Sequence, residues 1–98
     1  MCGAPAQGLS VEGIDVAKET VIQGSVVRDS QPVGGAYVRL LDASGEFTAE
    51  VVTSATGQFR FFAAPGAWTV LALAPGGRGE KTVDASKGEV SEVQVAVA

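Results

Sequence analysis

The chain has 98 residues, of which 46% are hydrophobic and 18% charged, and its formal net charge is -4. A chain this short forms one domain with a modest core, which excludes α/β barrels and doubly wound sheets. It contains no His and a single Cys, so Ser-His-Asp catalysis, Cys-His catalysis and ordinary zinc sites are excluded. We therefore expect no catalytic residue, no metal and no cofactor.

Residues 1–17 show no sustained hydrophobic period, which predicts an extended N-terminal arm, and residues 18–98 then form the folded domain. Within this domain, runs of β-branched and aromatic residues alternate with clusters of Gly, Pro, Asp and Ser. Seven strands are predicted in this way, at residues 20–28, 36–41, 46–53, 58–62, 67–73, 81–83 and 92–97. Short strands at this spacing are typical of an all-β antiparallel sandwich.

The strands at residues 58–62 and 67–73 are apolar on both faces. Neighbouring residues on a strand point to opposite faces, and a sandwich core covers only one of them. Something else must therefore cover the second face. One alternative is the arm, through Leu9, Val11, Ile14 and Val16, and the other is a partner or a second copy that contacts Phe62, Leu71 and Leu73.

Two arginines, Arg39 and Arg60, fall on the polar sides of their predicted strands. If they are neighbours, their forked donors could bind thiosulfate or a partner's carboxylates. The alternative is that they pair across strands with acidic residues such as Glu46 or Glu50, which is an ordinary way to stabilise a sheet.

Cys2, the single cysteine of the chain, is the only candidate nucleophile that the sequence offers. An exposed thiolate on an extended arm could accept sulfane sulfur and pass it on. No Arg, Lys or His lies near it in the sequence to lower the pKa of the thiol, so the alternative is an inert thiol.

The acidic balance of the chain opposes nucleic-acid binding, which needs a clustered positive surface. The longest apolar stretch, residues 61–74, is interrupted by Pro65 and Gly66 and is too short to cross a bilayer. The first residues lack the basic and apolar regions of a secretory signal. These features predict a cytoplasmic protein without a membrane or nucleic-acid partner.

Four pieces of the chain occur in an order that resembles the carboxypeptidase-regulatory-like, prealbumin-type β-sandwich, namely residues 22–28, 32–40, 53–59 and 65–70. This resemblance implies the fold but not an activity. Self-crosslinking pilin modules of this type need an Asn or Asp on the last strand, which residues 90–98 lack, although Lys18 could supply the amine. The prealbumin-like hydroxyisourate hydrolases need His and a terminal Tyr-Arg-Gly-Ser, and both are absent.

At whole-chain level the sequence resembles a short uncharacterised bacterial family of unknown function, encoded beside thiosulfate sulfurtransferases. The matching pieces include Met1-Cys2-Gly3, Lys18-Glu19-Thr20-Val21-Ile22 and residues 46–52 and 59–66. The resemblance implies a link to sulfur transfer. We therefore expect a non-catalytic interaction module that accompanies a thiosulfate sulfurtransferase or a related sulfur enzyme, with self-association possible. The alternatives are a persulfide carrier through Cys2 and an exported surface-binding module.

Overall fold

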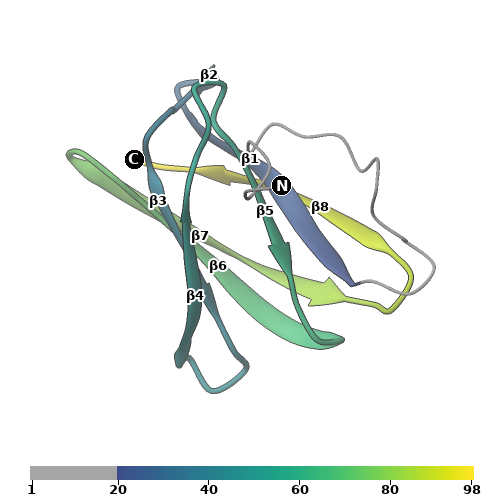
Figure 1. Cartoon of the computed structure of the whole chain (residues 1–98). Helices are drawn as coiled ribbons and strands as arrows, with labels where there is room; N and C mark the ends of the chain where they lie inside the picture. Colours follow the sequence, from purple (N-terminus) through teal and green to yellow (C-terminus); the bar gives the residue numbers. More distant parts are fainter. Residues whose placement is uncertain (1–19) are drawn as a thin grey trace.

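The computed structural model describes residues 20–98, and its regular structure is entirely β (Figure 1). The strands are β1 (Val21–Arg28), β2 (Gln31–Pro32), β3 (Tyr37–Leu41), β4 (Phe47–Val52), β5 (Gln58–Phe62), β6 (Gly66–Ala74), β7 (Gly77–Ala85) and β8 (Val90–Ala96). The predicted all-β sandwich is confirmed.

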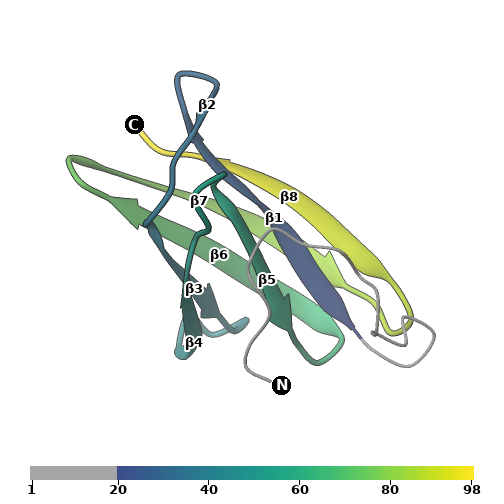
Figure 2. The ribbon, with the colours of Figure 1, turned by 45° about the horizontal axis from the view of Figure 1, so that its top comes forward.

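The strands form two layers, which we call sheet A and sheet B (Figure 2). In sheet A, β1 is central and pairs with β5, β2 and β8, and sheet B has the order β4-β3-β6-β7. The pairings are antiparallel except that of β1 with β8, which is parallel. This exception arises because the chain leaves β7 in sheet B and crosses to sheet A, where β8 enters in the direction of β1.

The described residues hold eight strands, one more than the sequence predicts, because β2 lies in the segment expected as a loop. Asp29 and Ser30 both have positive φ, 51° and 68°, and this geometry turns the end of β1 tightly onto β2. Strand β7 is also much longer than the predicted residues 81–83, since it pairs with β6 along its whole length.

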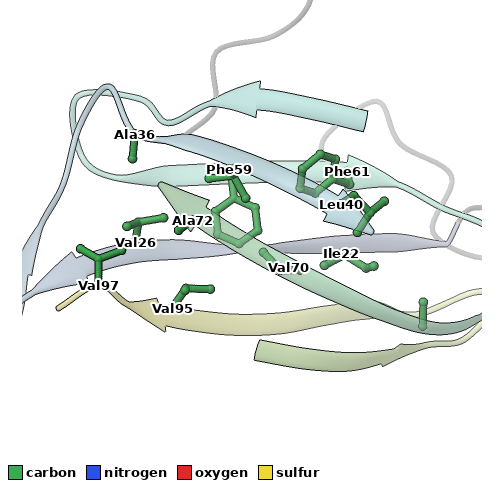
Figure 3. Packing of buried hydrophobic residues seen from close by; sticks show 12 residues of the cluster. Ile22, Val26, Ala36, Leu40, Phe59, Phe61, Val70, Ala72, Val95 and Val97 are labelled. Atoms are coloured by element: carbon green, nitrogen blue, oxygen red, sulfur yellow. The ribbon is translucent and has the colours of Figure 1, made fainter. Parts of the chain in front are cut away.

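The hydrophobic core lies between the sheets and is built from one face of each main strand (Figure 3). Phe59 and Phe61 of β5 pack with their ring centroids 5.9 Å apart at a tilt of 56°. They are surrounded by Ile22, Val26, Val38, Leu40, Val70, Ala72 and Val95. Because side chains alternate along a strand, the residues between these core positions form two outer faces, one on each sheet.

A buried threonine, Thr53, forms two hydrogen bonds where β4 ends and β3 begins. The Oγ1 atom of Thr53 accepts a hydrogen bond from the backbone N–H of Ala36 at 2.9 Å and donates one to the carbonyl of Val33 at 2.8 Å. Thr53 is 5% exposed, so water does not replace these bonds easily. The pair of bonds fixes where β3 begins relative to β4.

Candidate interaction surface

The register of sheet B arranges its outward side chains in rows across the strands. Tyr37 of β3 lies opposite Val52 of β4 and Leu73 of β6. In the next row Arg39 lies between Glu50 and Leu71, and in the third Leu41 lies opposite Phe47. We call this surface the sheet B outer face, made by Tyr37, Arg39, Leu41, Phe47, Glu50, Val52, Leu71 and Leu73.

This face gathers most of the large exposed apolar side chains of the described residues. Three of the four lie here: Tyr37 is 53% exposed, Phe47 62% and Val52 47%, whereas the fourth, Phe62, belongs to sheet A. Leu41, Leu71 and Leu73 are partly exposed beside them. A contiguous exposed apolar patch on a small domain commonly marks a protein interaction site.

One ion pair lies at the centre of the sheet B outer face. Arg39 donates a hydrogen bond from Nε to Glu50 Oε2 at 2.8 Å. Pairing across strands with Glu50 is one of the two sequence alternatives for Arg39, and it is the one found. Because each charge has a partner, the face carries little uncompensated charge at its centre.

The predicted surface of Phe62, Leu71 and Leu73 does not exist as one face. Phe62 alternates with the core residue Phe61 on β5, so it lies on the outer face of sheet A. Leu71 and Leu73 flank the core residue Ala72 on β6 and lie on the outer face of sheet B. The expectation was wrong because strands adjacent in sequence belong to different sheets, so their outward side chains point away from each other.

Arg39 and Arg60 are also on opposite sides of the sandwich, so the shared anion site is not formed. Arg60 of β5 is 6% exposed and donates from Nε to Gln23 Oε1 at 3.2 Å. Gln23 in turn donates from Nε2 to Glu92 Oε2 at 2.7 Å. This chain of hydrogen bonds crosses sheet A and joins three of its four strands, β5, β1 and β8.

A shallow groove of about 320 Å³ lies beside this chain. Its polar lining comes from Gln23, Ser25, Gln58, Glu92 and Gln94. Amides, a hydroxyl and a carboxylate can form hydrogen bonds with a polar molecule, and the Glu92 carboxylate already accepts one from Gln23. In residues 20–98 no group of three or more His, Cys, Asp or Glu is placed to hold a metal ion.

The turn between β3 and β4 is ordered by an acidic side chain. Asp42 accepts hydrogen bonds from Ser44 Oγ at 2.7 Å and from the backbone N–H groups of Ser44 and Glu46 at 2.9 and 3.0 Å. The Ser44 hydroxyl, followed by the backbone donors, holds the pKa of the Asp42 carboxyl below its usual 3.8.

The remaining predicted site residue, Cys2, lies outside the described residues, as do Lys18 and the apolar residues proposed to form a cover from the arm. Sequence reasoning did not single out Tyr37, Leu41, Phe47 or Val52. The alternation around Tyr37 could have indicated its outward position, but nothing local indicates which strands lie next to it. No helix in residues 20–98 has the length and apolar character needed to cross a membrane.

These features define a small all-β sandwich module with an apolar outer face and, among its described residues, no assembled catalytic group. The chain belongs to the family described as "Protein of unknown function (DUF1416)", whose model matches residues 2–97. Two uncharacterised proteins of Mycobacterium tuberculosis strain H37Rv are each 58% identical to it over 99 residues, which covers 99% of both chains. An uncharacterised protein of Mycolicibacterium smegmatis is 63% identical over 87 residues, covering 88% of this chain and 97% of the relative.

Solved structures share the fold at low sequence identity. A DUF3823 family protein from Parabacteroides merdae superposes with a TM-score of 0.67 and 17% identity, over 84% of this chain and 47% of that one. The structure titled S.CueP also gives a TM-score of 0.67, with 9% identity over 83% of this chain and 62% of that one. Catechol 1,2-dioxygenase from Pseudomonas arvilla C-1 gives 0.57 and 12% identity, over 89% of this chain and 55% of that one. The likeness concerns the β-sandwich alone.

Proposed function

We propose that this protein is a non-catalytic binding module whose sheet B outer face docks onto a partner protein. The observation that carries the proposal is the gathering of Tyr37, Phe47 and Val52, all about half exposed or more, on one side of one sheet. Covering such side chains removes apolar area from water, at about 25 cal/mol per Å². Aromatic residues with few rotamers, such as Tyr37 and Phe47, lose little entropy on docking and are common binding anchors.

The partner proposed is a thiosulfate sulfurtransferase encoded by the same genome. Support for this partner comes from the sequence resemblance to a family encoded beside such enzymes. The central ion pair supports a docking role for the face, because Arg39 has donors beyond the one bonded to Glu50. Those donors can meet a carboxylate or carbonyl of the partner and help to fix its orientation.

Titration calorimetry with the purified sulfurtransferase tests this function. We expect a complex at micromolar concentration that Leu71→Ser weakens at least about tenfold, equal to about 1.4 kcal/mol. Phe62→Ser is the matched control, because Phe62 is 55% exposed but lies on the other sheet. The proposal fails if no heat of binding is observed, or if Phe62→Ser weakens the complex as much as Leu71→Ser does.

A further inference from the structure

Within residues 20–98, strand β4 is an edge strand of sheet B. Among the described residues it pairs only with β3. The Thr53 N–H, just after β4, bonds to the Ala36 carbonyl at 2.9 Å and therefore points toward β3. Backbone groups alternate in direction along a strand. The N–H and C=O groups of Glu50 and Val52 therefore lie on the side of β4 opposite β3, where an added strand could pair with them.

The opposite edge of sheet B, strand β7, is covered at its start. The backbone N–H of Ala98 donates to the carbonyl of Arg78 at 3.3 Å, which joins the end of the chain to β7. A side chain at Gly79 would place its Cβ 1.9 Å from the Ala96 carbonyl oxygen, so this close approach requires glycine. The C-terminal residues thus protect the start of β7, and no described segment does the same for β4.

The sequence of β4 has little of the usual protection against pairing. Exposed edge strands commonly carry Lys, Pro or an inward-pointing charge. Strand β4 reads FTAEVV, and its one charge, Glu50, is already paired with Arg39. A register shift between Leu40 and Leu41 disturbs only the pairing with the start of β4.

We propose that the partner docks by strand addition, with an extended segment that forms backbone hydrogen bonds along β4. This rests on the proposed function and specifies how the partner is recognised. Alternate side chains of the added strand then lie on the sheet B outer face beside Val52 and Glu50. The segment that fits carries an apolar residue beside Val52 and a Lys or Arg beside Glu50, whose side chain is 33% exposed and can accept a second hydrogen bond besides the one from Arg39. A second copy fits less well, because two chains of formal charge -4 repel each other.

Amide hydrogen exchange, followed by NMR with and without the sulfurtransferase, tests this mode of docking. We expect exchange of the Glu50 and Val52 amides to slow about tenfold or more in the complex, because each gains an acceptor. If the complex forms but these amides exchange as before, strand addition is overturned while the binding function stands. If no complex forms, both proposals fall. If both amides are already protected in the free protein and a dimer is found by sedimentation, a second copy occupies the edge and the proposal is also overturned.

A matched pair of variants supplies a second test. Glu50→Ala and Glu50→Pro both remove the ion pair with Arg39, but only the proline also removes the outward N–H. An edge position with its N–H toward solvent is where a strand tolerates proline best. We expect Glu50→Pro to bind the sulfurtransferase about tenfold or more weakly than Glu50→Ala, and equal affinities would overturn the proposal. Should Glu50→Pro fail to fold, the amide exchange of the unaltered protein decides.

Discussion

Arg39 Nε lies 2.8 Å from Glu50 Oε2, and this ion pair joins β3 to β4 in the middle of an otherwise largely apolar sheet face. The two side chains are 45% and 33% exposed, so water and salt screen their attraction. We expect Arg39→Met to change the free energy of unfolding by less than about 1 kcal/mol, measured by urea denaturation. A loss of several kcal/mol would show that the pair has a structural role that its exposure does not explain.

Truncating a side chain on the inner face of β5 should lower the free energy of unfolding much more than truncating one on its outer face. Phe59 is fully buried between the sheets, and Phe59→Ala should lower the free energy of unfolding by about 3 to 5 kcal/mol. Phe62→Ala, on the outer face of the same strand, should cost less than about 1 kcal/mol. Equal losses in urea denaturation would contradict the assignment of Phe59 to the core and Phe62 to the surface.

The two hydrogen bonds of the Thr53 hydroxyl should contribute to the free energy of unfolding. Thr53→Val keeps the shape of the side chain but leaves the Ala36 N–H and the Val33 carbonyl without this partner. We expect a loss of about 1 to 3 kcal/mol, as for other unsatisfied buried groups. Thr48→Val, at an exposed position of β4, is the control and should stay within about 0.5 kcal/mol of the unaltered protein.

The lowered pKa of Asp42 predicts a dependence of stability on pH. A carboxyl whose pKa is lower in the folded state stabilises that state above the unfolded pKa, and the contribution is lost as the pH falls through the folded pKa. The Tm difference between the unaltered protein and Asp42→Asn should therefore be largest above pH 3.8 and shrink below it. Ser44→Ala removes the shortest hydrogen bond to this carboxyl and should weaken the pH dependence of Tm. A Tm difference that does not vary with pH would contradict the assignment.

The persulfide hypothesis for Cys2 has a direct test by intact mass spectrometry. This hypothesis predicts a gain of one sulfur atom on incubation with thiosulfate and the sulfurtransferase: the enzyme's thiolate takes the sulfane sulfur and releases sulfite, and the Cys2 thiolate then takes that sulfur and releases the enzyme's thiolate. Cys2→Ser should show no gain. An unchanged mass of the unaltered protein would rule out the carrier role without affecting the docking proposal, which depends on other residues.

The sequence predicts most of this fold because its hydrophobic alternation is clear where strands face the core. Val38 and Leu40 alternate with exposed residues, and Phe59 and Phe61 share one face as expected. Strand β7 is under-predicted because Gly77 and Gly79 are poor strand formers in isolation. The reason for glycine at these two positions is seen only in the folded structure, where the end of the chain lies against their backbone and leaves no room for a Cβ.

The candidate surface could be predicted only in part, because it depends on which strands become neighbours. Leu71 and Leu73 are correctly expected to lie outside the core, but their neighbour is Tyr37 and not Phe62. Alternation alone places Phe47 on the same face as Ala49 and Val51. The register shift in the pairing of β3 with β4 instead puts Phe47 opposite Leu41, on the outer face. No local sequence signal marks such a bulge.

The most direct test of the central claim is a methyl NMR map of the protein titrated with the sulfurtransferase. The sheet B outer face predicts that the methyl signals of Val52, Leu71 and Leu73 shift or broaden first. Signals of Val27 and Val90, whose side chains lie on sheet A, should stay unchanged at the same ratio. Changes confined to the sheet A signals, or no change in any methyl signal, would contradict the claim.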